Sequence, residues 1–224
     1  MAKVHPIFSQ KGGVGKTTIA VNLAAVVATT IQSDPADPSV LVVSIDPQGS
    51  AVWWAERTDV EKLPFDFEQM DDNLDGVSKL SQEPYEHVFV DAPGSLARPR
   101  ILATVLDQAD DVLVPAVPEP LAYMPTLRTV RDFIEPRHKP YLVVRNLWDP
   151  RDGKTDLDAL TSWLGENDLQ TANTVVRRYK MHTTAAGEGR VVTQYPRGRT
   201  ATEAKNDLLQ LALECGYGGT RKAV

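Results

Sequence analysis

The stretch SQKGGVGKTT (residues 9–18) constrains this chain most, because it joins a strand-like run to a helix-like run. The apolar segment VHPIF (4–8) indicates a strand, and residues 16–30, rich in Ala, Val and Leu, predict a helix. Glycines at such a junction let backbone N–H groups converge on phosphate oxygens, and the helix N-terminus adds a favourable partial charge. The sequence therefore predicts a phosphate-binding loop.

The polar side chains of this loop have expected tasks on a nucleotide. Lys16 is expected to contact the β- and γ-phosphates, Thr17 to ligate Mg²⁺, and Thr18 to hydrogen-bond the α-phosphate. The stretch departs from G-x-x-x-x-G-K-[ST] at the first glycine, where Gln10 stands. The alternative is a glycine-rich turn that merely precedes a helix, which the flanking segments disfavour. The expected nucleotide-binding residues are Lys11, Gly12, Gly13, Val14, Gly15, Lys16, Thr17 and Thr18.

Short Val/Ile/Leu runs alternate with longer helix-like stretches along the rest of the chain. Near-continuous apolar strands separated by helices are typical of a parallel sheet covered on both faces. No internal repeat or linker divides the sequence, so residues 1–224 are expected to form a single doubly wound α/β domain with a mostly parallel, twisted sheet. Further strands are expected at 40–45, 64–69, 87–93, 111–117, 140–146 and 174–180, and helices at 50–57, 74–80, 98–108, 121–134, 155–166 and 200–214.

Composition excludes several classes of protein. The lone Cys215 rules out a disulfide framework, a zinc site built on cysteines and a thiolate-held cluster within one chain. No run of about 18 apolar residues indicates a membrane-spanning helix, and the N-terminus lacks the long apolar region of a secretory signal. We expect a cytoplasmic protein. The net charge of −6 argues against a uniformly basic surface but leaves room for a local basic patch.

Two aspartates stand at the ends of predicted strands. Asp46 lies in SIDPQGS, and Asp91 ends the apolar run VFVD. Side chains at the carboxyl ends of parallel strands face the crevice in which nucleotides bind. Mg²⁺ dehydrates reluctantly, so Asp91 would hold it through a water. Each aspartate taken alone could instead be a turn former, because Asp-Pro and Asp-Ala-Pro-Gly are good turn sequences.

Three segments together resemble the deviant Walker A family of ParA, MinD and nitrogenase iron-protein ATPases: KGGVGKTT (11–18), DPQGS (46–50) and VFVDAPGS (88–95). The resemblance implies ATP/ADP and Mg²⁺ as cofactors and ATP hydrolysis by in-line attack of water. It implies that Lys11 reaches the nucleotide of the other subunit in a homodimer. It also implies that Asp46 positions or activates the attacking water and belongs, with Thr17 and Asp91, to the metal site. The alternative for Lys11 is a solvated surface lysine.

Within this family the chain is most similar to small plasmid-partition ATPases of the ParF type. VPAVPEPLAY (114–123) resembles their proline-containing segment, and the chain begins at its first strand without an N-terminal helix-turn-helix extension. The resemblance implies an ATP-dependent sandwich dimer that binds nonspecific DNA and associates with the nucleoid. It also implies a centromere-binding adaptor protein of the ParB/ParG kind as a partner. For adenine, Arg145 and Asn146 are candidates, with an ordinary strand end as the alternative.

Basic residues gather in one region of this acidic chain, where Glu188 is the one acid among them. Phosphate contacts from such a region suffice for DNA binding without sequence preference. A merely solvated charged face is the alternative. The candidate DNA-binding residues are Arg177, Arg178, Lys180, Arg190, Arg197 and Arg199.

Two rival functions remain open. A MinD-like membrane ATPase needs a terminal amphipathic helix, whereas the apolar positions between Leu208 and Leu213 suggest a core helix, so no membrane partner is expected. A metabolic P-loop enzyme is also possible, because a fold alone does not fix function.

Overall fold

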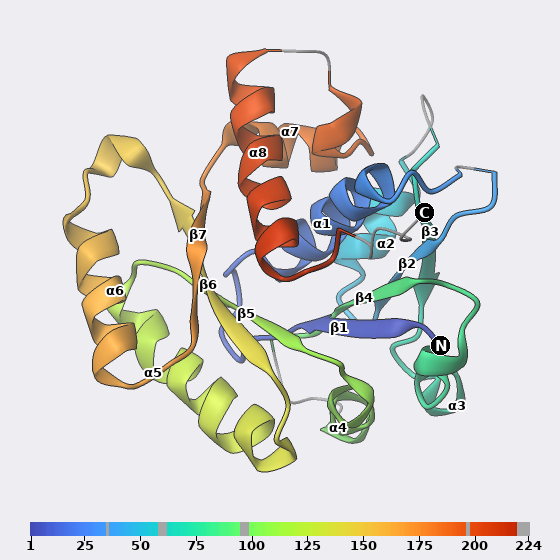
Figure 1. Ribbon diagram of the computed structural model, residues 1–224, viewed down its shortest axis with the longest axis horizontal. Helices are drawn as coiled ribbons and strands as arrows, with labels where there is room; N and C mark the ends of the chain where they lie inside the picture. The colour runs from blue at the N-terminus through green and yellow to red at the C-terminus, as the bar shows by residue number, and fades with distance from the viewer. Residues whose placement is uncertain (35, 58–61, 95–98, 196–197, 219–224) are drawn as a thin grey trace, which may run out of the picture.

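The computed structural model describes residues 1–34, 36–57, 62–94, 99–195 and 198–218 (Figure 1). Its centre is a seven-stranded sheet in the order β3-β2-β4-β1-β5-β6-β7, and every neighbouring pair of strands is parallel. The strands are β1 (Lys3–Ile7), β2 (Val40–Ser44), β3 (Asp66–Gln69), β4 (His87–Asp91), β5 (Val112–Ala116), β6 (Tyr141–Trp148) and β7 (Thr171–Arg177). The expected parallel α/β fold is confirmed.

Helices cover both faces of the sheet (Figure 1). On one face, α1 and α8 pack with α2 and α7 over one buried apolar cluster, and on the other α3, α4, η2 and α6 pack over a second. The α-helices are α1 (Lys16–Thr30), α2 (Ser50–Ala55), α3 (Leu74–Val77), α4 (Pro99–Gln108), α5 (Pro120–Arg128), α6 (Thr155–Glu166), α7 (Lys180–Gly187) and α8 (Arg199–Glu214). The 3₁₀ and π segments are η1 (Leu80–Gln82), η2 (Thr129–Ile134), η3 (Glu135–Arg137), η4 (Pro150–Asp152) and η5 (Val192–Gln194).

The burial of each element follows its apolar pattern. All five residues of β2, β4 and β5 are buried, as expected for strands covered on both faces. Helix α1 is buried almost all round because it lies between the sheet and α8. Helix α8 buries one stripe, which includes Ala204, Leu208 and Leu211, so this closing helix is a core element. No helix within the described part of the chain is long and apolar enough to cross a membrane.

The predicted last strand is misplaced, since β7 runs from Thr171 to Arg177. The run at 174–180 was expected to be a strand throughout, but β7 ends at Arg177 and Lys180 begins helix α7. This helix is short and buries His182 and Ala185 without a repeating apolar stripe, so its sequence carries little helical signal.

The strand register gathers the predicted site. Ile7 of β1 pairs with Asp91 of β4, and Ser44 of β2 pairs with the same aspartate from the other side. The loop after β1 and the segment that begins at Asp46 therefore start on either side of Asp91, at the carboxyl edge of the sheet. In an open parallel sheet, this edge is where ligands bind.

Candidate functional site

The phosphate loop adopts a conformation that only glycine accommodates easily at its last position. Gly15 caps helix α1 with φ of 84°, in the left-handed region. A Cβ added there would lie 2.6 Å from Nδ2 of Asn146. The same Nδ2 donates a hydrogen bond of 2.7 Å to the carbonyl oxygen of Val14, and Asn146 is only 2% exposed. Asn146 of strand β6 thus fixes the backbone of the loop at Val14.

Lys16 is the first residue of α1 and is buried at the cavity wall. Its Nζ donates a hydrogen bond of 3.3 Å to the carbonyl oxygen of Lys11, so the loop curls around the ammonium group. Burial lowers the pKa of Lys16, and the carboxylates of Asp91 and Asp46 oppose that effect. A buried cation at the start of a helix offers a strong site for an anion.

Asp91 and Thr17 join strand β4 to helix α1. Thr17 Oγ1 donates a hydrogen bond of 2.8 Å to Oδ2 of Asp91. The carboxyl group is fully buried, which raises its pKa to about 7; Asp46 also raises the pKa, while the Thr17 hydrogen bond and Lys16 lower it. Its other oxygen, Oδ1, has no hydrogen-bond partner among the described residues. A free carboxylate oxygen beside a hydroxyl fits the oxygen ligands that Mg²⁺ prefers.

Asp46 serves as a turn former and as part of the cavity wall. Its Oδ1 accepts a hydrogen bond of 3.0 Å from the backbone N–H of Gln48, and its carbonyl oxygen accepts one of 3.1 Å from the N–H of Gly49. The half-buried side chain lines the same cavity as Lys16. The turn and the cavity position are therefore compatible, and the turn leads directly into α2.

The cavity at this edge has a volume of about 700 Å³. Its walls come from the phosphate loop, the turn after β2, helix α2, the segment after β4 and the end of α7. The lining residues are Gly12, Gly13, Gly15, Lys16, Thr17, Thr18, Asp46, Gln48, Gly49, Ser50, Trp53, Trp54, Gly94 and Ala186. The structure thus brings together most of the predicted loop with Asp46 in one cavity wall. Asp91 does not line the cavity but accepts a hydrogen bond from Thr17, which does.

A second cavity of about 890 Å³ adjoins the first, since both are lined by Gly13, Thr18 and Ala186. Its other walls include the segment from Val117 to Glu119, the end of β6 and the start of α7. The first cavity, with buried Lys16 in its wall, suits an anionic group, and the second cavity extends it toward Arg178 and Lys180.

The two residues expected to contact adenine have other partners. Arg145 donates hydrogen bonds to Thr161 Oγ1 and to the carbonyl oxygens of Ala172 and Asn173, at 3.1, 2.9 and 2.8 Å, and it lines neither cavity. Its expected role at adenine is therefore not supported, because the guanidinium is committed to holding β6 against α6 and β7. Asn146 serves the phosphate loop instead of lining the second cavity.

Sequence reasoning missed the aromatic wall of the first cavity. Trp53 and Trp54 both line it, and Trp54 is 3% exposed. The pair follows DPQGS after Ala51 and Val52, so two adjacent indoles shortly after a phosphate-site aspartate were the available signal. His182 of the second cavity was also missed; burial lowers its pKa to about 4, so the ring is neutral at neutral pH.

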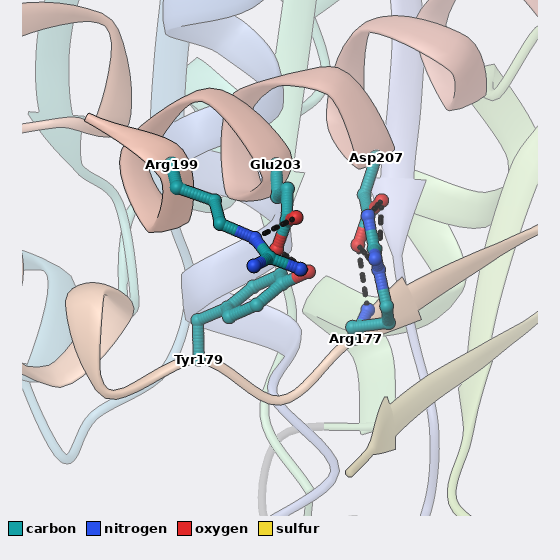
Figure 2. A network of polar contacts seen from close by, with 5 residues as sticks. All are labelled: Arg177, Tyr179, Arg199, Glu203 and Asp207. Carbon is teal, nitrogen blue, oxygen red and sulfur yellow. Dashed lines mark hydrogen bonds and ion pairs between the residues drawn. The ribbon is translucent and has the colours of Figure 1, made fainter. Parts of the chain in front are cut away.

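Two of the candidate DNA-binding arginines are held by acids of helix α8 (Figure 2). Arg177 Nη2 lies 2.6 Å from Asp207 Oδ1, and its Nε lies 2.9 Å from Oδ2. Arg199 Nε lies 3.1 Å from Glu203 Oε1, while Tyr179 donates to the other oxygen of that glutamate at 3.2 Å. Counting acids only within the basic segment overlooked these partners, which come from the following helix.

The remaining candidates differ in exposure. Arg178 and Lys180 are exposed, and neither forms an ion pair with a described residue. Arg190 lies 4.0 Å from Glu188 and over the ring of Tyr195. Arg197 lies outside the described residues. The accessible positive charge is therefore concentrated at the start of α7.

Comparison with known proteins agrees with this site. A family model described as an AAA domain matches residues 2–64. The chain is 37% identical over 212 residues to the maintenance of carboxysome distribution protein A of Gloeobacter kilaueensis. The aligned region covers 95% of this chain and 93% of that protein. The chain belongs to the ParA/MinD family of P-loop ATPases.

Solved structures of other ParA/MinD proteins share the fold. An ATP complex of a Cyanothece McdA variant superposes with a TM-score of 0.72 at 13% identity, covering 96% of each chain. A Borrelia burgdorferi protein described as a putative plasmid partition protein, bound to AMPPNP, superposes with a TM-score of 0.67 at 17% identity, covering 96% of this chain and all of the other. At these identities the likeness shows the architecture alone.

The pairing of Arg177 with Asp207 predicts a difference in stability. Asp207→Ala should lower the free energy of unfolding by about 1–3 kcal/mol, because it removes charge-assisted hydrogen bonds from a mostly buried carboxylate. Arg199→Ala is the matched control, since that arginine is 91% exposed, and its effect should be much smaller. Urea denaturation followed by circular dichroism measures both. Equal losses would mean that Arg177 is not a structural residue.

Proposed function

We propose that this chain binds ATP with Mg²⁺, dimerises around the nucleotide and uses hydrolysis to release itself from nonspecific DNA. The observation that carries the proposal is the arrangement of Lys16, Thr17 and Asp91, in which a buried cation and an unpartnered carboxylate oxygen meet at one cavity. Such a cavity suits a charged ligand that brings its own cation, as a nucleoside triphosphate does.

In this proposal the chain's own groups bind and orient the reactants. Lys16 and the N–H groups of the loop would hold the β- and γ-phosphates, and Thr17 and Asp91 would hold Mg²⁺, whose chemistry when bound would be to neutralise charge on the phosphoryl group. Asp46 orients the attacking water from the opposite wall of the cavity. Trp53 and Trp54 of α2 form an aromatic part of the wall of the first cavity.

Lys11 is proposed to act in the partner subunit's site. Lys11 precedes Lys16 in the same loop, and its carbonyl oxygen accepts a hydrogen bond from Lys16 Nζ. Its side chain is not buried. A cation delivered from the other subunit stabilises charge on the γ-phosphoryl group, as an arginine finger does. Dimerisation would then depend on ATP, because the nucleotide forms part of the interface.

DNA binding is proposed to centre on Arg178 and Lys180, with Arg190 and Arg199 contributing. Contacts from these residues to phosphates would give affinity without sequence preference. Arg177 is better explained as a structural residue, because Asp207 neutralises it. A protein with this activity would associate with the nucleoid.

The cargo is proposed to be a carboxysome-type body, because the whole-length relative at 37% identity is named for carboxysome distribution. A plasmid, positioned through a centromere-binding adaptor of the ParB/ParG kind, is the second candidate and rests on the resemblance of the sequence to ParF-type proteins. Both cargoes require the same ATP and DNA cycle. Turnover of ATP measured with and without nonspecific DNA tests that cycle, and no DNA effect on binding or turnover would refute it.

Replacement of Lys11 tests the role of the dimer. Lys11→Ala should abolish ATP-dependent dimerisation and lower turnover about a thousandfold, while nucleotide affinity is largely kept because Lys16 remains. Light scattering with an ATP analogue and a phosphate-release assay measure these effects. Lys79→Ala, an exposed lysine before η1, is the control. A Lys11 variant that dimerises and hydrolyses like the wild type would make this lysine a surface residue only.

Charge reversal at the start of α7 tests the DNA surface. The double variant Arg178→Glu and Lys180→Glu should lose retention on duplex DNA, and any residual binding should show a salt slope smaller by about 2. The control is Lys3→Glu with Lys79→Glu, which makes the same change in net charge with two other exposed lysines. Gel shifts at low salt compare the two, at an ATP concentration that saturates each variant, because Arg178 and Lys180 also line the second cavity. Equal loss in both would indicate that net charge alone matters.

A further inference from the structure

Helix α7 is a wall that both cavities share. Ala186, near its end, lines the two cavities, while Lys180 and Thr183 line the second. Figure 1 shows α7 beside α8, on the face of the sheet that also carries α1. Any ligand that fills both cavities therefore touches this helix along much of its length.

The same helix has exposed positive charge at its start and a basic residue just beyond its end. Lys180 is its first residue, Arg178 stands two residues before it, and Arg190 follows its last turn. The residues that face the cavities and the residues proposed to contact DNA thus belong to one short segment. An adjustment of α7 to a bound nucleotide would move all three basic side chains together.

Helix α2 holds the end of this segment. The indole Nε1 of Trp54 donates a hydrogen bond of 2.9 Å to the carbonyl oxygen of Arg190. Trp54 also lines the first cavity, and α2 begins directly after the turn formed by Asp46. The backbone at residue 190 is thereby fixed to the helix that follows the Asp46 turn and lines the first cavity.

The contact between the two segments leaves no room for a side chain at Gly189. This residue is buried with φ of 65°, and an added Cβ would lie 2.2 Å from the carbonyl oxygen of Arg57, just past α2. Both the left-handed conformation and the close approach require glycine. Gly187, two residues earlier, differs on both counts, since a Cβ there would meet nothing within 4 Å.

Helix α1 supplies a second attachment. Asn22, which is fully buried, accepts a hydrogen bond of 2.9 Å from the N–H of Val192 and donates one of 2.9 Å to the carbonyl oxygen of Thr18. Thr18 belongs to the phosphate loop and lines both cavities. The segment after α7 is thus connected by buried polar contacts to both helices that follow the nucleotide-binding turns.

We propose that the turn at Gly189 and Arg190, held by Trp54 of α2 and followed by the attachment to Asn22 of α1, transmits nucleotide occupancy to the basic residues at the two ends of α7. The inference rests on the proposed function and names how its DNA affinity is regulated. Packed contacts of this kind shift between discrete arrangements rather than deforming smoothly. A nucleotide that favours one arrangement raises DNA affinity, and by reciprocity DNA raises nucleotide affinity by the same factor.

Gly189→Ala, compared with Gly187→Ala, tests the turn directly. In the wild type and in Gly187→Ala, a slowly hydrolysed ATP analogue should slow hydrogen exchange of the amides in 180–194 and raise affinity for nonspecific duplex DNA about tenfold. Gly189→Ala should bind the analogue as tightly as its control but lose both responses. The same responses in the two variants would overturn the inference.

The two readouts separate this inference from the proposed function. DNA binding that is absent from the wild type in every nucleotide state refutes the proposed function, while the exchange measurement still decides whether nucleotide occupancy reaches α7. DNA binding without any exchange response in 180–194 refutes the inference alone. If Gly189→Ala does not fold by circular dichroism, Trp54→Phe, which keeps an aromatic ring and removes the N–H donor to Arg190, replaces it, with Trp53→Phe as its control. Because both indoles line the first cavity, each variant is measured at a saturating concentration of the analogue. Trp54→Phe alone should lose both responses, and the same responses in the two variants would overturn the inference.

Discussion

The hydrogen bond from Thr17 to Asp91 is the interaction on which the site depends. It exists because β1 and β4 run parallel in a register that pairs Ile7 with Asp91, so that the loop after β1 returns over the end of β4. This geometry buries a carboxylate, leaves one of its oxygens unpartnered and places Lys16 close enough to oppose the resulting cost of burial. The cavity and its charge follow from that placement, and the proposed binding of a phosphate with a divalent cation rests on both.

The other walls of the site come from distant parts of the chain. Asn146 of β6 fixes the carbonyl oxygen of Val14, Trp54 of α2 closes the side next to Asp46, and α7 closes the side toward the second cavity. Trp54 and α7 also make contacts away from the cavities, to the carbonyl oxygen of Arg190 and to α8. The site is therefore connected to the surface segments around it, and the basic start of α7 is among them.

Much of this arrangement was predictable from the sequence. The phosphate loop, the two aspartates and the parallel sheet follow from local patterns: glycines before a helix, aspartates after apolar runs, and strands alternating with helices. The role of Arg145 was not predictable, because its partners Thr161, Ala172 and Asn173 come from later elements. The neutralisation of Arg177 was missed for the same reason, and α7 was missed because a short helix that faces cavities lacks a strong apolar stripe.

The central claim is that Asp91 and Thr17 hold Mg²⁺ beside the phosphates of ATP. Isothermal titration of ATP with and without Mg²⁺, on the wild type and on Asp91→Asn, tests it most directly. The amide keeps an oxygen that can accept the Thr17 hydrogen bond but removes the charge. The account predicts that Mg²⁺ strengthens ATP binding by the wild type about tenfold or more, whereas the variant shows little Mg²⁺ dependence. An equal Mg²⁺ effect on both proteins would contradict it.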